Sequence, residues 1–472
     1  MSSTAAAQPG SPTKGMTFGV FVATSFMLFS MYFGAGNLIF PPMLGAEAGE
    51  AFTPAILGFL LAGVALPILA IIAIAISGAN MRDLASRGGY LFGLIFPVLV
   101  YLSIGAFYAL PRTGAVSFST AIQPVTGWDS TLASGVFNFI FFAIALALAY
   151  NPTSIMNKLG KFLTPALLVL LVVLITMAYF KFTGVAQESI DAYATSPLAA
   201  GLLEGYLTMD ALAGLAFGIV VISALRYTGI PEGAARVRGT IWCGIGAGVL
   251  LAVIYIGLGY TGIKMPDARS FDDGAGLLAS AAGLAMGGIG QAIFGAIALL
   301  ACMTTAVGLI AATSEFFALL MPGVNYKAWA IIFSLMSFGM ATMGLDTVLA
   351  IAAPVVTFIY PPAITLILIT LVEPVVHKKT SFYWTFRLSL WMAVIWSALT
   401  VLIDLGFDAL SPLVSWAPMQ DLSLGWILPV LIAFIVGLVL DLTTKHPQHQ
   451  TALDKAIEEE HGTEESAAAS PC

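Results

Sequence analysis

The sequence predicts an all-α polytopic membrane protein with about twelve transmembrane helices. Of its 472 residues, 59% are hydrophobic and only 9% are charged, and the mean hydropathy is +0.97. A soluble globular domain carries roughly 25% charged residues, so that class of protein is excluded. Apolar runs of about 20 residues, the length that an α-helix needs to cross a bilayer, recur along the chain. We therefore expect a lipid bilayer around the chain, with no nucleic acid and no obligate protein partner.

Twelve apolar segments are the predicted spans: 17–47, 52–77, 91–121, 131–151, 162–181, 207–226, 241–262, 289–320, 328–345, 347–371, 386–404 and 425–442. The first, third and eighth are too long for straight spans, so each must tilt, break or extend past the bilayer. Together the segments define a transmembrane domain over residues 16–442. The polar ends, residues 1–15 and 443–472, have too few apolar residues to form a core and are predicted to be disordered.

The positions of lysine and arginine predict that both termini are cytoplasmic, because cytoplasmic loops carry an excess of these residues. With twelve spans and an inside N-terminus, 14 of the 18 lysines and arginines fall in inside loops or tails, and three fall outside. The remaining one, Arg112, lies within a span. An odd number of spans would remove this bias. The first apolar segment is also too long for a signal peptide, so it is expected to stay in the membrane.

The first apolar segment is interrupted near its middle by residues 30–42, whose centre reads Phe-Gly-Ala-Gly-Asn. A bilayer has no water to satisfy free backbone groups, so glycine breaks at membrane depth are tolerated where neighbours or a cavity satisfy the backbone. Gly34, Gly36 and Asn37 therefore predict a broken helix. The alternative is a pair of close-packing glycines, which is common in membrane helices.

The spacing also predicts a 5+5 inverted repeat, made of residues 17–181 and 207–371, followed by two extra helices within 386–442. Each half begins with a candidate broken helix, and in the sixth segment we place the break around Gly214 and Gly218. Five spans are an odd number, so the second half is inverted relative to the first. Broken first helices in inverted repeats hold substrate and ion at the midplane of one class of secondary transporters. For Gly214 and Gly218, ordinary packing is an equally weighted alternative.

Three stretches carry a resemblance to a known family: residues 28–42, residues 109–113 and residues 206–212. They resemble the bacterial branched-chain amino acid:cation symporters of the BrnQ type (LIVCS), and the resemblance covers all twelve spans. More distantly, the pattern is similar to the leucine-transporter fold of the amino acid-polyamine-organocation superfamily. The resemblance implies sodium symport of leucine, isoleucine or valine by alternating access in the inner membrane of a bacterium, and no enzyme activity. Proton coupling or exchange on the same fold is the alternative.

The resemblance further implies a sodium site between the first break and the eighth segment. The matching oxygens are the carbonyls of Ser30, Phe33 and Ala301 and the hydroxyls of Thr304 and Thr305. Neutral oxygens suit a hard monovalent ion that must be released, and the three residues of the eighth segment share one helical face. Alternatively, the threonines bond carbonyls of their own helix. Proton coupling instead predicts a titratable group in place of these hydroxyls.

The substrate site is expected between the two breaks. The free N–H groups of Ala35, Gly36 and Asn37 are expected to bind the carboxylate of the substrate. The backbone carbonyls of the unwound parts of the first and sixth helices are expected to bind its ammonium group. Other candidates line the breaks or the third segment: Tyr32, Gly34, Tyr108, Phe217, Gly218, Ile219 and Val220. For each aromatic residue, ordinary packing is the alternative.

Charged residues inside spans are costly and commonly functional, which draws attention to Arg112, Asp210 and Glu315. Arg112 follows Tyr108 by four residues, on the same helical face, and is a candidate to pair with Asp210 in a gate. For Asp210 and Glu315 a solvated position at a segment end is the alternative. All four histidines lie in predicted cytoplasmic regions, and the chain has no P-loop pattern, which argues against a histidine relay or an ATP-driven pump.

Overall fold

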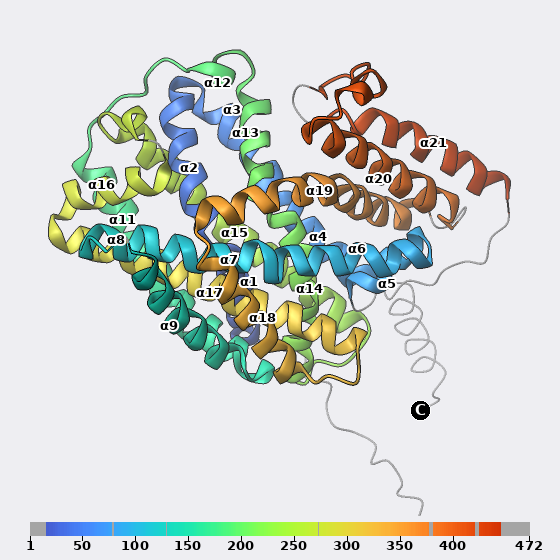
Figure 1. The fold of residues 1–472 in the computed structure, drawn as a ribbon, viewed down its shortest axis with the longest axis horizontal. Helices are drawn as coiled ribbons and strands as arrows, with labels where there is room; N and C mark the ends of the chain where they lie inside the picture. Colours follow the sequence, from blue (N-terminus) through green and yellow to red (C-terminus); the bar gives the residue numbers. More distant parts are fainter. Residues whose placement is uncertain are drawn as a thin grey trace, which may run out of the picture.

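The computed structural model describes residues 16–77, 80–128, 130–271, 273–376, 381–420 and 424–444. Within these residues every regular element is a helix, which confirms the all-α class (Figure 1). In the described part of the chain, nine helical segments are long and apolar enough to cross a membrane, judged by length and composition. Four further apolar helices are shorter, namely Phe18–Tyr32, Gly274–Met286, Tyr326–Ala341 and Ile427–Thr443, so the count of twelve spans stays a prediction. The predicted disordered ends, residues 1–15 and most of 443–472, lie outside the described residues.

The helices of the first half follow one another closely. In chain order they are α1 (Phe18–Tyr32), α2 (Ala35–Ala48), η1 (Gly49–Ala51), α3 (Phe52–Leu60), η2 (Leu61–Ala65), α4 (Leu66–Ser77), α5 (Met81–Ala85), η3 (Ser86–Gly88), α6 (Tyr90–Leu102), η4 (Ser103–Phe107), α7 (Ala109–Ser117), η5 (Phe118–Ile122), α8 (Gln123–Thr126), α9 (Thr131–Ala149), η6 (Pro152–Ser154), α10 (Ile155–Lys158), η7 (Leu159–Leu163), α11 (Thr164–Lys181) and α12 (Asp191–Thr195).

The second half contains the longest helices. Its elements are α13 (Pro197–Leu207), α14 (Asp210–Tyr227), α15 (Ala234–Lys264), η8 (Ala268–Ser270), α16 (Gly274–Met286), α17 (Gly288–Leu320), α18 (Tyr326–Ala341), α19 (Leu345–Val376), α20 (Trp384–Asp404), η9 (Asp408–Leu413) and α21 (Ile427–Thr443). The helices α20 and α21 lie together at one side of the molecule, where α20 also packs against α19 (Figure 1).

The break predicted in the first helix lies at Phe33 and Gly34. The helix α1 ends where the N–H of Phe33 donates to the carbonyl of Phe29 at 2.8 Å. Gly34 is extended, with φ −113° and ψ −161°, and its N–H donates to Asn37 Oδ1 at 3.1 Å, which caps the start of α2. A Cβ atom on Gly34 would lie 2.9 Å from Thr305 Oγ1, so this close approach of α17 requires glycine.

A second break joins α13 to α14, but it does not lie where the glycines predicted it. The linking residues are Thr208 and Met209, and Met209 adopts the left-handed conformation with φ 61°. Gly214 and Gly218 lie within the continuous helix α14, so the predicted break at these two residues is wrong. Both are packing glycines: added Cβ atoms would lie 2.7 Å from Tyr32 Oη and 2.6 Å from Ile74 Cγ2, respectively. Small residues here let α14 approach α1 and α4.

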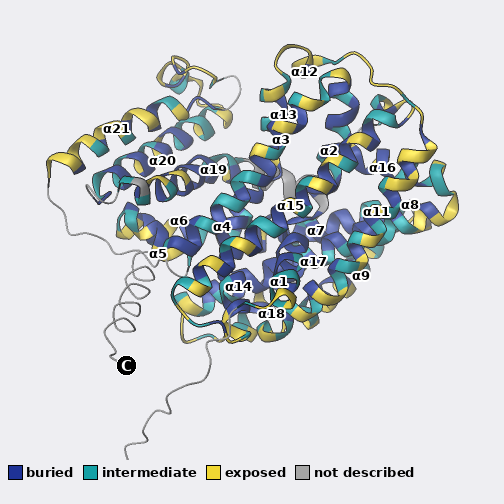
Figure 2. Cartoon of the chain, turned by 180° about the vertical axis from the view of Figure 1, so that it is seen from behind, coloured by how far each residue is buried: buried dark blue, intermediate teal, exposed yellow. Residues whose placement is uncertain are grey.

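The centre of the molecule is formed by α1, α14 and α17, and α17 also packs against α7. In the most apolar part of α14, 78% of residues are buried, whereas only 28% are buried in α9. Figure 2 shows the same contrast, with buried residues gathered centrally and exposed residues along the outer helices. The exposed side chains of α9 include Phe139 and Ile140, which suits contact with lipid tails. The two breaks therefore lie in the protein interior.

Candidate functional site

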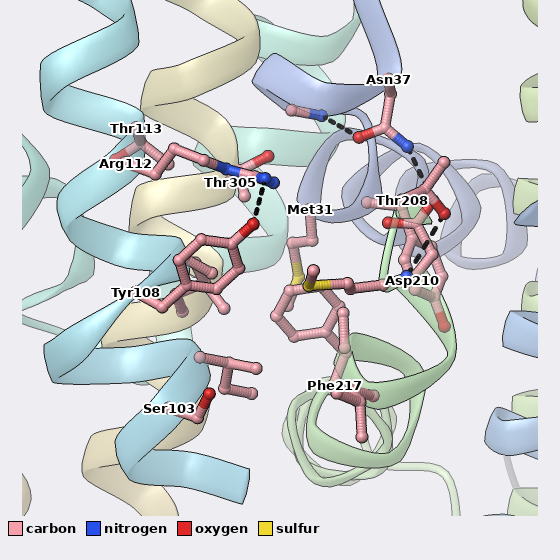
Figure 3. Close-up of a pocket in the computed structure, with 18 of the residues that line it drawn as sticks. Met31, Asn37, Ser103, Tyr108, Arg112, Thr113, Thr208, Asp210, Phe217 and Thr305 are labelled. Carbon is pink, nitrogen blue, oxygen red and sulfur yellow. Dashed lines mark hydrogen bonds between the residues drawn. The ribbon is translucent and has the colours of Figure 1, made fainter. Parts of the chain in front are cut away.

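A narrow cavity of about 40 Å³ lies between the two breaks, α17 and the segment from η4 to α7 (Figure 3). Its walls combine apolar side chains with two charged groups, three hydroxyl-bearing threonines and one asparagine. The lining residues are Met31, Tyr32, Gly34, Asn37, Ser103, Ile104, Tyr108, Ala109, Arg112, Thr113, Thr208, Met209, Asp210, Leu212, Ala213, Phe217, Thr305, Leu309 and Val356. Apolar walls with a few convergent polar groups are typical of a site for a small molecule.

One wall holds a hydrogen-bonded group that joins the two breaks. Asn37 Nδ2 donates to Asp210 Oδ2 at 2.7 Å and also to the hydroxyl of Tyr255. The same Tyr255 hydroxyl donates to Asp210 Oδ2 at 3.4 Å. Because Asn37 Oδ1 already caps Gly34, a single side chain fixes both the start of α2 and the start of α14. Tyr255 lies in α15 and was not among the predicted residues; nothing local in its sequence distinguishes it from a packing tyrosine.

The opposite wall carries Arg112 and Tyr108, which share a helical face as predicted. Arg112 Nη1 donates to the Tyr108 hydroxyl at 2.6 Å, and its guanidinium carbon lies 4.8 Å from the centre of that ring. Ion pairs within 4 Å among the described residues include Arg87–Glu373 and Arg236–Glu232. Arg112 and Asp210 form no direct pair in this conformation and lie on opposite walls of the cavity, so the gate stays a prediction (Figure 3).

The residues proposed for sodium are only partly brought together. Thr305 Oγ1 donates to the Ser30 carbonyl at 3.4 Å and therefore faces the break in the first helix. Thr304 Oγ1 instead donates to Leu300 and Ala301 carbonyls of its own helix, at 2.9 and 3.0 Å. This is the alternative arrangement weighed for the threonines. The contact that is present brings together one hydroxyl and one carbonyl oxygen without formal charge, and such oxygens suit a monovalent hard cation.

Only some of the predicted substrate residues line the cavity, and in α14 the last of them is Phe217. Tyr32, Tyr108 and Phe217 line the cavity, and Phe217 packs edge-on against Tyr32 with ring centres 5.5 Å apart. Gly218, Ile219 and Val220 are buried in α14 and do not line it. In a continuous helix, successive side chains point in different directions, so Gly218 and Ile219, directly after Phe217, turn away from the cavity.

The lining residues that were missed include the true second break, Thr208 and Met209, and the first turns of α14, Leu212 and Ala213. The others come from α1, the segment from η4 to α7, α17 and α19: Met31, Ser103, Ile104, Ala109, Thr113, Leu309 and Val356. The stretch 206–212 had been singled out as a motif, but glycine was used as the marker of the break. A threonine two residues before the helix start was the available signal, since small hydroxyl residues commonly flank helix starts.

The remaining predicted residues lie in the first turn of α2. Ala35 begins the helix, and a Cβ atom on Gly36 would lie 3.3 Å from Arg112 Nη2. The first N–H groups of a helix have no acceptor within it, so this turn presents donors beside the guanidinium. The cavity therefore has hydrogen-bond donors, the Arg112 guanidinium and the first N–H groups of α2, on one side and the Asp210 carboxylate on the other.

A family model described as "Branched-chain amino acid transport protein" matches residues 19–444. The chain belongs to this family. The recognised family is thereby confirmed, and so is the prediction that the protein is a transporter and not an enzyme. Family membership covers both breaks and every residue that lines the cavity.

Curated relatives of this transport family match along nearly the whole chain. The branched-chain amino acid permease BrnQ of Corynebacterium glutamicum is 56% identical over 426 residues, covering 90% of this chain and 96% of that protein. The branched-chain amino acid permease BraB of Bacillus subtilis is 36% identical over 426 residues, covering 89% of this chain and 95% of that protein.

Among solved structures, Mhp1, a nucleobase-cation-symport-1 family transporter, in a closed conformation with bromovinylhydantoin bound, matches with a TM-score of 0.57. The alignment covers 88% of this chain and 91% of Mhp1, at 13% sequence identity. At this identity the match shows the fold alone. The helical transporter fold predicted from the sequence is thus confirmed at this level.

Proposed function

We propose that this protein imports leucine, isoleucine or valine together with sodium by alternating access. The observation that carries the proposal is the cavity between two broken helices, with free helix N–H groups on one side and apolar walls of Ile104, Phe217 and Leu309. The relatives named as branched-chain amino acid permeases support the substrate class. A branched aliphatic side chain would lie against these walls, and the backbone at the breaks would bind its polar end.

Sodium is proposed as the coupling ion, bound at the first break by the oxygens of Ser30, Phe33, Ala301, Thr304 and Thr305. The contact between Thr305 Oγ1 and the Ser30 carbonyl supports this site, because it joins α17 to the broken helix at one point. An ion bound there would stabilise the arrangement of the break that forms the substrate site. Binding of one solute would then favour binding of the other, as symport requires.

For the arrangement in the membrane, we propose twelve spans with both termini in the cytoplasm of a bacterial cell and the inner membrane as the location. Residues 17–181 and 207–371 would form the inverted repeat, and α20 and α21 the two additional spans. One break lies near the start of each half, between α1 and α2 in the first and between α13 and α14 in the second, and this supports the arrangement.

The alternative is proton coupling or exchange on the same fold. Asp210 is a buried carboxyl group in the cavity, so a titratable group does exist near the breaks, although not in place of the threonine hydroxyls. The coupling ion is therefore the point that an experiment must decide.

The test is uptake of labelled leucine, isoleucine and valine into proteoliposomes, under an inward sodium gradient or an inward proton gradient without sodium. Sodium-driven accumulation is expected for the wild-type protein. Thr305→Ala is expected to abolish it, and Thr305→Ser, which keeps the hydroxyl, to retain most of it. Accumulation driven equally by protons without sodium would overturn the sodium assignment. No accumulation under either gradient would overturn the substrate class.

A further inference from the structure

Arg112 and Asp210 are the two charged side chains that line the cavity. Among the described residues, neither lies within 4 Å of an oppositely charged side chain. Charged groups at membrane depth are expensive, and they pair with one another or mark the path of a substrate or ion. Their placement on opposite walls indicates that the partner of each is a molecule bound between them (Figure 3).

The guanidinium group of Arg112 has more donors than the described residues use. Of its five N–H donors, one is engaged, by the Tyr108 hydroxyl at 2.6 Å. Its Nη2 atom lies beside the first turn of α2, 3.3 Å from the position of a Cβ atom on Gly36. An anionic group placed there would receive hydrogen bonds from the guanidinium and from the free N–H groups of that turn. The planar guanidinium matches the geometry of a carboxylate.

Asp210 supplies the opposite charge from the other wall. It is 4% exposed, and its side chain is held by Asn37 and Tyr255, both of which bond to Oδ2. These bonds hold the carboxylate through Oδ2, and the Thr208 side chain is a further hydrogen-bonding neighbour of it. The side chain enters from the first turn of α14, directly after the break at Met209, and faces the cavity.

We propose that Arg112 binds the α-carboxylate and Asp210 the α-ammonium group of a zwitterionic amino acid. The charges of Arg112 and Asp210 cancel, so a bound zwitterion leaves the cavity with no net charge. A ligand with a single charge would leave one of the two side chains without an oppositely charged partner. This pair would therefore select free amino acids over amides and simple carboxylic acids. The inference rests on the proposed function and adds to it the side chains that recognise the polar end of the substrate.

The test measures the binding of leucine, leucinamide and 4-methylpentanoate, each titrated alone against the full-length protein in nanodiscs at saturating sodium. Leucinamide lacks the carboxylate, and 4-methylpentanoate lacks the ammonium group. The wild-type protein is expected to bind both at least about tenfold more weakly than leucine, as the loss of a charge-assisted hydrogen bond predicts. Equal binding of leucine and either analogue by the wild-type protein would overturn the inference without any variant.

Variants assign the two roles. Arg112→Gln is expected to weaken leucine binding roughly 10- to 100-fold while leaving leucinamide binding within about twofold, because leucinamide never used that charge. Asp210→Asn is expected to weaken leucine binding similarly and to leave 4-methylpentanoate unchanged. Arg82→Gln and Asp267→Asn make the same substitutions at exposed sites away from the cavity, and they are expected to keep the wild-type pattern.

Three outcomes would contradict the inference. Equal losses of leucine and leucinamide binding in Arg112→Gln would make Arg112 a structural residue. A higher sodium requirement in Asp210→Asn, with unchanged discrimination against 4-methylpentanoate, would assign Asp210 to the ion. If Arg112→Gln still takes up leucine and the ratio of its affinities for leucine and leucinamide is unchanged, the inference is wrong and the proposed function stands. If the wild-type protein neither binds nor accumulates leucine, the proposed function itself is wrong.

Discussion

The two helix breaks that meet at the cavity are held by different means. At the first break, Gly34 allows close approach of Thr305, and Asn37 caps the start of α2 from three residues away. At the second break, Met209 adopts a left-handed conformation, and α14 starts without a side-chain cap from that residue. The first break is thus fixed by local contacts and by α17. The second has a local bond from the Asp210 N–H to Thr208 Oγ1 at 3.4 Å, and its Asp210 side chain is also held by Asn37 from the first break. Asn37 is therefore the physical link between the two halves of the site.

Gly34→Ala should have the largest effect, because it tests the tight contact at the first break. The added methyl group would lie 2.9 Å from Thr305 Oγ1 and 3.3 Å from its Cγ2, so Thr305 or the break must move. We expect leucine uptake to fall roughly tenfold or more, as overpacking of this size predicts. Gly19→Ala is the matched control, since nothing lies within 4 Å of a Cβ atom there. Wild-type uptake by Gly34→Ala would mean that the contact with α17 is not needed.

Asn37→Ala should have the next largest effect, because it removes the link between the breaks. It leaves the Gly34 N–H uncapped and takes one donor from the buried Asp210 carboxyl. We expect a loss of about 2–4 kcal/mol in the free energy of unfolding, from one neutral and one charge-assisted hydrogen bond. Thermal unfolding in detergent measures it, with Asn80→Ala as the control. Asn80 caps the short helix α5 through exposed hydrogen bonds, so losing it should cost only about 1 kcal/mol.

An equal loss for Asn37→Ala and Asn80→Ala would contradict the idea that Asn37 joins the halves. The buried network would then contribute no more than an ordinary cap, and the second break would be held by its own backbone.

The difference between the two breaks also explains why the position of the first could be predicted from the sequence and the position of the second could not. Glycines next to Asn37 marked the first break correctly, because a close approach and a cap both leave local signs in the sequence. The second break contains no glycine, and the strain at Met209 is imposed by surrounding packing. The break was therefore predicted at the nearby Gly214 instead. The i, i+4 pair of Tyr108 and Arg112 was predictable from helix geometry.

The contacts that complete the site were not predictable in the same way. Asn37 meets Tyr255, which is 218 residues away in the chain, and no local pattern brings these two side chains together. Likewise, Thr304 and Thr305 are neighbours with the same side chain, yet only Thr305 bonds to the first break. Their different roles depend on how α17 is rotated against α1, which is a property of the packed bundle.

Substitutions at Met209 should have the smallest effects, and they test the strain at the second break. A non-glycine residue with φ 61° costs about 1–2 kcal/mol, so Met209→Gly should relieve most of that cost, offset in part by the loss of an apolar side chain from the cavity wall. Met209→Val should lower the melting temperature, because β-branched residues are strongly disfavoured in this conformation. Opposite shifts for the two variants, measured by thermal unfolding, would indicate that Met209 holds the break under strain. Equal losses for both would instead mean that the side chain of Met209, through its packing, is what stabilises the break.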